Sequence, residues 1–338
     1  MSFFLFILLT GMIFVRPGEI IPALVGWQFF FYLAVPCIFL SFQSICGQLS
    51  GRSLQEQPIT LCILGLLLAM LASNLAHFDI DAATSIGRLF LQNVIYYLLL
   101  VSLVNTPSRL RWLLFWLWLF TVLSIVLALL QFHGFIELSN MEAVDSRFVM
   151  ETGEETMSKR MTGSGLFADP NDLCVVIVIG FILSIYLIGE RFFRLPRLLY
   201  VMSSLVFGYG LMKTQSRGGF IALMVACSVL LITHYGWKKA VMLGCAVLPV
   251  LLVIFKGRLT AISTQEATSH SRIELWSDGV EFFKSSPIFG VGAGKFADFT
   301  SGHHVAHNAY VQAYAELGLF GGPFFTGAFF LPYGGFIA

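Results

Sequence analysis

Long apolar segments recur along nearly the whole chain, and they restrict the possible folds more than any other feature. A helix that crosses the hydrocarbon core of a bilayer needs roughly 20 apolar residues, and most of the segments approach that length. The sequence therefore predicts an all-α, polytopic helical membrane protein of about ten spans, with residues 1–338 forming a single membrane-embedded domain. The segments are Phe3–Val15, Ile20–Phe42, Ile59–Ala76, Leu89–Val104, Trp112–Phe132, Leu173–Ile188, Leu198–Met212, Phe220–Tyr235, Ala240–Phe255 and Ala309–Phe330.

Composition supports the membrane class and excludes others. Hydrophobic residues make up 57% of the chain and charged residues only 12%, whereas soluble domains carry roughly 25% charged residues. The net charge of +1 provides no basic surface for nucleic acid. The cysteines all lie in or beside apolar segments, so neither structural disulfides nor a cysteine metal site is predicted.

The loops between the segments differ in basic residues, which predicts the orientation. Loops on one side carry Arg52, Arg109, Arg111, Arg191, Arg194, Arg197, Lys238 and Lys239. Short loops on the other side carry Arg16, Arg88, Lys213 and Arg217. Because cytoplasmic loops are enriched in Lys and Arg, the N-terminus is expected inside, and the two long loops, about 134–170 and 256–306, outside.

The first long loop is acidic and polar, and its composition predicts a mobile segment. It ends at Asp169-Pro170-Asn171-Asp172. We interpret this run as a helix N-cap followed by a first-turn proline and acid, rather than as a catalytic carboxylate.

The second long loop is expected to contain an amphipathic helix on the external membrane surface. Ser271 and Glu274 match a capping box, and Ile273, Trp276, Val280 and Phe283 follow at helical spacing. Ser285-Ser286-Pro287 should end this helix. Gly290, Gly292 and Gly294 then form either a turn, which we favour, or a backbone anion site.

Titratable and basic side chains gather at the predicted external rim. His303, His304 and His307 precede the last apolar segment, and three interpretations stay open: a metal site, an interfacial cluster, or a base that titrates near neutral pH. Arg272 lies near the start of the surface helix, and Arg217 begins another span beside Gly218-Gly219. Both arginines suit a pyrophosphate, although basic residues at membrane rims also anchor to lipid phosphates.

A pair of aspartates, Asp79 and Asp81, lies in another predicted external loop. Asp-x-Asp pairs hold divalent metals in many glycosyltransferases. As an isolated tripeptide, the pair is more typical of a solvated loop.

Several of these segments occur together, in order, in one family. His307-Asn308, then nine residues, then Gly318 and Gly321, satisfy every position of its ligase motif. On these residues the chain resembles the O-antigen ligase and polymerase superfamily of bacterial envelope glycosyltransferases. Other segments similar to the family are Phe167–Leu173, Ser216–Gly219, Ser271–Trp276 and Pro287–Gly292. The resemblance implies further spans after the histidine helix, whereas this chain ends at Ala338, which predicts a truncated C-terminus and puts activity in doubt.

The resemblance implies a metal-independent, inverting glycosyltransferase without a cofactor. It would move a glycan from an undecaprenyl (polyprenyl) pyrophosphate carrier to a hydroxyl of the lipid A core or of another glycan, among membrane lipids at the periplasmic face of the bacterial inner membrane. His307 would be the base, Arg217 and Arg272 would bind pyrophosphate, and Asn308 would orient His307 or the sugar. Gly318 and Gly321 would allow close helix packing.

Alternatives within the superfamily are a polysaccharide polymerase and a protein O-oligosaccharyltransferase. A transporter of lipid-linked sugars would place charged groups inside the spans, whereas here the strong polar groups gather at the rim. A metal-dependent transferase that uses Asp79 and Asp81, and an inactive membrane scaffold, also stay open.

Overall fold

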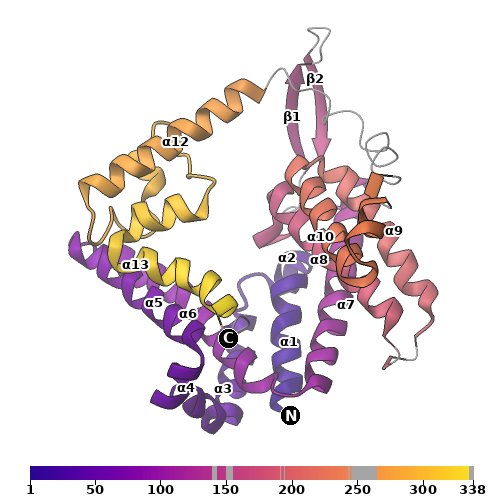
Figure 1. Cartoon of the computed structure of the whole chain (residues 1–338), viewed down its shortest axis with the longest axis horizontal. Helices are drawn as coiled ribbons and strands as arrows, with labels where there is room; N and C mark the ends of the chain where they lie inside the picture. The colour runs from indigo at the N-terminus through magenta and orange to yellow at the C-terminus, as the bar shows by residue number, and fades with distance from the viewer. Residues whose placement is uncertain are drawn as a thin grey trace. The chain divides into compact units, whose positions relative to one another are not determined.

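The computed structural model describes residues 1–138, 143–149, 155–190, 192–193, 195–242, 244–245 and 265–334. Most of these residues are helical, and the described part of the chain contains seven helices long and apolar enough to cross a membrane. The protein is an all-α polytopic membrane protein, as predicted (Figure 1). These seven spans are Ser2–Ile20, Phe29–Gln48, Pro58–Ala76, Ile80–Leu103, Pro107–Phe132, Pro170–Gly189 and Arg217–Tyr235.

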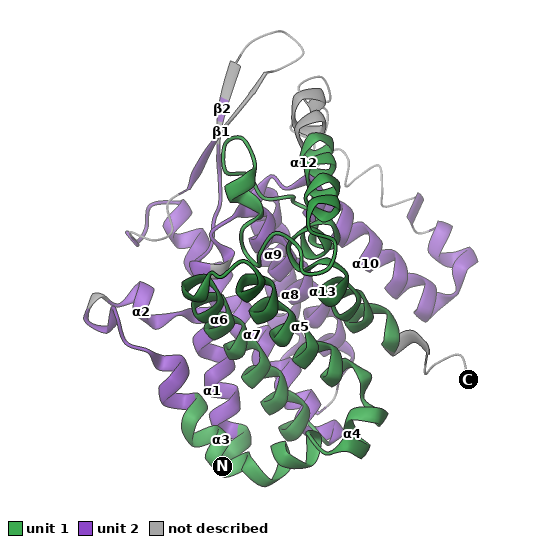
Figure 2. Cartoon of the chain, turned by 90° about the vertical axis from the view of Figure 1, so that its left-hand side faces the viewer, with its two compact units in different colours: residues 1–3, 34–105, 265–338 green, residues 4–33, 106–264 purple. Residues whose placement is uncertain are grey.

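The chain divides into two compact units, each assembled from segments that are distant in sequence (Figure 2). Unit 1 comprises residues 1–3, 34–105 and 265–338, and unit 2 comprises residues 4–33 and 106–264. The single domain expected for residues 1–338 stays a prediction.

Unit 2 is built around a bundle of helices from the middle of the chain. Its central elements are α7 (Pro107–Phe132), α8 (Pro170–Gly189), α9 (Arg197–Thr214) and α10 (Arg217–Tyr235). Before α7 come α1 (Ser2–Val15), α2 (Pro17–Ile20) and η1 (Pro22–Leu24). Between α7 and α8 lie the hairpin of β1 (Val144–Val149) and β2 (Glu155–Arg160), and η2 (Gly165–Phe167). In the bundle core the indole of Trp118 donates hydrogen bonds to the hydroxyls of Ser184 and Ser203, at 3.0 and 3.1 Å. These bonds satisfy polar groups that would be costly to bury alone.

Unit 1 joins helices from both ends of the chain. It contains most of α3 (Phe29–Gln48), with α4 (Gly51–Glu56), α5 (Pro58–Ala76), α6 (Ile80–Leu103), α12 (Gln265–Ser285), η3 (Phe296–Phe299) and α13 (Ala309–Gly334).

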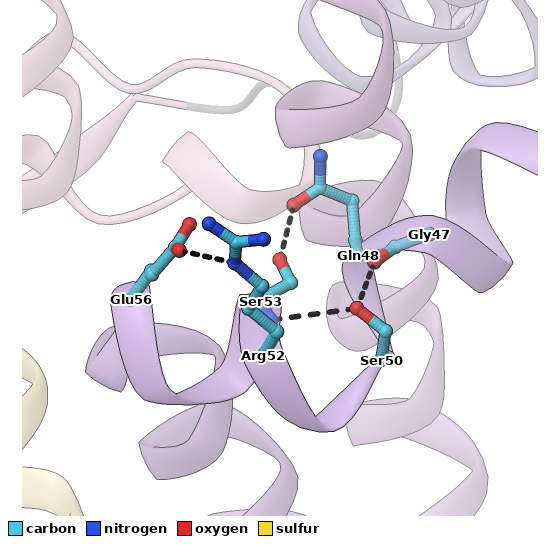
Figure 3. A network of polar contacts seen from close by, with 6 residues as sticks. All are labelled: Gly47, Gln48, Ser50, Arg52, Ser53 and Glu56. Carbon is cyan, nitrogen blue, oxygen red and sulfur yellow. Dashed lines mark hydrogen bonds and ion pairs between the residues drawn. The ribbon is translucent and has the colours of Figure 1, made fainter.

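The short helix α4 connects two long helices through local polar contacts (Figure 3). Ser50 caps it by accepting a bond from the backbone N–H of Ser53 at 3.4 Å. Arg52 and Glu56 form an exposed ion pair one turn apart. Arg52 belongs to the loops that the sequence assigns to the cytoplasm.

Helices α5 and α13 pack closely because glycines remove side chains from the contact. A Cβ on Gly65 of α5 would lie 2.6 Å from the ring of Phe324, and a Cβ on Gly321 of α13 would lie 2.9 Å from the Cβ of Ala69. The packing role of Gly321 stays a prediction, and its short distance to Ala69 supports it.

Several boundaries differ from the sequence prediction. The second span begins at Phe29 rather than Ile20, because Pro22 starts a 3₁₀ turn and Gly26 adopts a left-handed conformation. The first long loop, predicted to be mobile, contains the antiparallel hairpin β1–β2. Most of the predicted span Ala240–Phe255 lies outside the described residues.

The surface helix also starts earlier than predicted. It begins at Gln265, so Ser271 lies inside α12 and the predicted capping box is wrong. Its end at Ser285 is confirmed. The exposed side chains of Ile273 (59%) and Val280 (50%) are available for membrane contact, whereas Leu275 is buried within unit 1. The placement of α12 on the membrane surface stays a prediction.

Gly65→Ala is predicted to loosen the contact between α5 and α13. The added methyl would overlap the Phe324 ring, and overpacking of this kind costs about 1–3 kcal/mol. The matched control Gly47→Ala adds a methyl with nothing within 4 Å, so it should leave stability unchanged or raise it slightly. Thermal unfolding in detergent measures both variants, and equal midpoints would contradict the packing argument.

Candidate functional site

The motif glycine Gly318 breaks α13. At the break, backbone hydrogen bonds within the helix are replaced by hydrogen bonds to another segment of the chain. The backbone of Gly318 is non-helical, with φ 61° and ψ −156°. The N–H groups of Leu319 and Phe320, which lie just beyond the break, donate to the carbonyls of Pro287 and Ile288 at 2.8 and 2.9 Å. A Cβ on Gly318 would overlap the carbonyl oxygen of Ile288, so this position requires glycine for both conformation and space.

The carbonyls on the other side of the break are also paired with the same incoming segment. Ala315 O accepts from Val291 N at 3.0 Å, and Glu316 O accepts from Gly292 N at 3.3 Å. Segment 287–292 thus replaces two bonds of the helix. Since these backbone N–H groups are used internally, the interpretation of the glycine run as a turn is favoured over an anion site.

The carboxylate of Glu316 is buried beneath this turn. Its side chain is 8% exposed. Oε2 accepts from the backbone N–H of Gly294 at 2.8 Å, and Oε1 accepts from the backbone N–H of Phe296 at 3.3 Å and the Gln312 amide at 2.9 Å. Sequence reasoning missed this residue, although an acid inside an apolar segment is the signal that could have found it.

His307 lies at the end of the loop that follows the glycine turn. It is exposed and adopts a left-handed conformation, with φ 49°. The next residue, Asn308, caps α13, because its Oδ1 accepts from the N–H groups of Tyr310 and Val311 at 3.0 and 3.3 Å. The cap fixes the backbone next to His307 and occupies the Asn308 side-chain oxygen.

Helix α12 holds the same loop from the side. The indole N–H of Trp276 donates to the carbonyl of Ala306 at 2.9 Å, one residue before His307. Arg272 precedes Trp276 by four residues and is exposed. Residues four apart share a helix face, so the arginine and the indole lie on the same side of α12.

An ion pair connects the start of α6 to the glycine turn, which contains Gly290, Gly292 and Gly294. Asp79 accepts from Ala82 N at 2.8 Å, which caps α6, and pairs through its other oxygen with Lys295. The Lys295 hydrogen bond, with the Ala82 bond after it, lowers the pKa of the Asp79 carboxyl from its usual 3.8. The imidazole of His77 lies 2.8 Å from the carbonyl of Gly290.

These contacts change the interpretation of the Asp79-Ile80-Asp81 tripeptide. Asp79 is a helix cap and an ion-pair partner rather than a residue of a solvated loop, and both its oxygens are engaged. Within the described ranges, no group of three or more His, Cys, Asp or Glu side chains is arranged to hold a metal ion.

Arg217 occupies the first turn of α10 in unit 2. Ser216 caps this helix by accepting from Gly219 N at 3.2 Å, and its hydroxyl donates to Asn171 Oδ1 at 2.9 Å. The predicted cap of α8 is confirmed, since Asp169 accepts from Asn171 N at 2.6 Å.

A second arginine, not identified from the sequence, lies beside these two helix starts. Arg160 is 9% exposed and donates from Nε to Thr214 O at 2.9 Å and from Nη2 to Asn171 Oδ1 at 3.2 Å. Two arginines, Arg160 and Arg217, therefore lie where α8 and α10 begin, together with the acids Asp169 and Asp172 of α8.

The structure thus brings His307, Asn308, Arg272 and Gly318 together within unit 1, whereas Arg217 belongs to unit 2. The fold and these groups define a polytopic helical membrane protein that presents an exposed histidine on a loop fixed to a broken helix.

Comparison with known proteins gives one family match. Residues 201–326 match the family model described as O-antigen ligase, and this stretch contains all six candidate residues. The match supports membership of the O-antigen ligase and polymerase superfamily, whose members are membrane enzymes of the glycosyltransferase or ligase type. No curated protein and no solved structure matches the chain.

The Asp79–Lys295 pair predicts a pH-dependent contribution to stability. Because the pKa of Asp79 is lower in the folded protein, the contribution is complete above the ordinary carboxyl pKa and is lost as pH falls through the folded value. Asp79→Asn should therefore lower the thermal midpoint at pH 7, and the difference from the parent protein should shrink below about pH 3.8. The control Asp298→Asn alters an exposed acid of the same unit and should show a smaller difference. If the difference in thermal midpoint between Asp79→Asn and the parent protein does not change with pH, the Asp79–Lys295 contribution is not the one described.

Proposed function

We propose that this protein transfers a glycan from a polyprenyl-pyrophosphate carrier to an acceptor hydroxyl at the external face of the bacterial inner membrane, in the manner of an O-antigen ligase. The observation that carries the proposal is the exposed His307, held between the Asn308 cap and the Ala306–Trp276 hydrogen bond. An accessible imidazole on a fixed backbone is suited to accept a proton from an incoming hydroxyl.

The chemistry needs one base and a means of stabilising the leaving group. The acceptor oxygen attacks the anomeric carbon as His307 takes its proton, and the carbon–oxygen bond to pyrophosphate breaks. One displacement inverts the anomeric configuration. The departing pyrophosphate is already a good leaving group, so cations can replace a general acid.

Two arginines are proposed to supply these cations. Arg272 is exposed on the α12 face whose Trp276 holds the His307 loop, which supports a role near the imidazole. Arg217 lies at a capped helix N-terminus beside Arg160, a setting that favours anions. Guanidinium groups bind phosphate oxygens in a forked geometry.

The proposed scheme is independent of metal. Its donor is an undecaprenyl-type pyrophosphate glycan, and its acceptor is the lipid A core or, for a polymerase, another glycan. Polymerase and protein-glycosylating activities are the alternatives within the same chemistry.

His307→Asn is the sharpest test of the base. Asparagine tolerates the left-handed conformation at this position better than other non-glycine residues, so the loop should persist while the base is lost. Transfer of glycan from a defined lipid-linked donor by the purified protein should fall roughly 10²–10⁴-fold. His304→Asn, a change in the same loop, is the matched control. Full activity of His307→Asn would remove the base assignment.

Arg272→Ala and Arg217→Ala test the leaving-group role. Each should lower the kcat/KM for the donor by about tenfold or more, since charged hydrogen bonds are worth about 1.5–3 kcal/mol. Lys284→Ala, on the exposed last turn of α12, is the control for Arg272.

Glycan transfer by the parent protein is expected to persist when a chelator is added. Loss of transfer in the chelator would support a metal-dependent route instead.

A further inference from the structure

Glu316 is a buried acid to which the proposed chemistry assigns no role. A buried carboxylate is unfavourable unless donors surround it. Here three donors do so, and two of them are backbone N–H groups of Gly294 and Phe296, from the loop that leads to His307. The third donor, Gln312, lies one turn before Glu316 on α13.

The loop is attached to α13 at both of its ends. It leaves the helix surface at 294–296, where Glu316 binds it, and rejoins the helix at Asn308, which is the cap. Along the helix axis these attachment points are about 12 Å apart, at 1.5 Å per residue. Buried Phe296 packs with Ala306 and Ala315 between them.

His307 therefore stands at one end of a loop whose other end is set by the Glu316 carboxylate. The break at Gly318 adds to this arrangement, because it redirects the Glu316 carbonyl to Ser73 Oγ (2.6 Å) and Gly292 N (3.3 Å). Side chain and backbone of Glu316 thus both bind the segment before the histidine.

We propose that Glu316 is a positioning residue for glycan transfer, whose carboxylate sets the path of residues 294–307 and thereby the place of the His307 imidazole. This inference rests on the proposed function. It assigns no proton transfer to Glu316. Errors of about 1 Å in the position of a reacting group can cost as much as 10²-fold in rate, so small changes in the loop should be visible in turnover.

Glu316→Gln tests the proposal with almost no change in volume. The amide keeps one oxygen for a backbone N–H, but its NH₂ group then faces the other N–H. The kcat of the folded protein should fall about tenfold or more, with the donor KM changed less than twofold, since a displaced base affects turnover more than binding. Glu281→Gln, an exposed acid on α12, is the matched control and should keep full activity.

A double-mutant cycle separates positioning from a general loss of stability. If Glu316 acts through His307, adding Glu316→Gln to His307→Asn should cost less than twofold more, because the base it positions is already gone. Additive losses in the double variant would overturn the proposal, as would full kcat in Glu316→Gln. If His307→Asn itself keeps full activity, the base assignment fails, and if the parent protein transfers no glycan, the proposed function fails. Both outcomes are distinguishable from a failure of the Glu316 proposal.

Hydrogen exchange gives a readout that is independent of activity. Glu316→Gln should speed amide exchange across residues 294–307 and leave α5 protected, whereas Glu281→Gln should alter neither. If Glu316→Gln does not fold, Glu316→Asp takes its place, because it keeps the charge and shortens its reach by one methylene. Unchanged exchange in residues 294–307 would overturn the proposal.

Discussion

The exchange of hydrogen bonds at the break in α13 is the constraint on which the His307 loop of unit 1 depends. In a continuous helix, Leu319 and Phe320 would bond back to Ala315 and Glu316. Here all four groups pair instead with segment 287–292. Because no backbone group is left unsatisfied by this exchange, the helix can break without a large loss of stability. The loop gains a fixed attachment, and the two glycines of the motif acquire different tasks: Gly318 permits the break, and Gly321 permits contact with α5.

This constraint explains why the motif spans both a histidine and a distant glycine. The nine residues between Asn308 and Gly318 form the first part of α13, and Glu316 lies near its end. The loop that carries His307 must span this short helix from the break to the cap. Changing the helix length by one residue would rotate Glu316 by about 100° away from the loop it binds. The spacing is therefore a structural requirement of the loop as well as a family signature.

The sequence predicted the elements whose signals are local. Apolar length identified most spans, Asp169-Pro170 was placed correctly as a helix cap, and Arg217 was placed correctly at the start of a span. The start of α12 was wrong because a serine–glutamate pair occurs within helices as well as at their ends. Hairpin β1–β2 was missed because its strands show no strong alternation of apolar and polar residues.

The site was harder to predict because it depends on contacts between distant segments. His307, Arg272 and Gly318 were identified by type and motif, but the segments that precede His307 and Gly318 are held by Ser73 and by the pair of Asp79 with Lys295. Nothing local in the sequence links Asp79 to a lysine more than 200 residues later. The one local signal that was overlooked is Glu316, an acid in an apolar helix, and its cost of burial indicates that its partners matter. An apolar residue there would pack without cost but would bind no backbone N–H. The acid therefore stabilises one loop path over others, and this selectivity is what a base at the end of that loop requires.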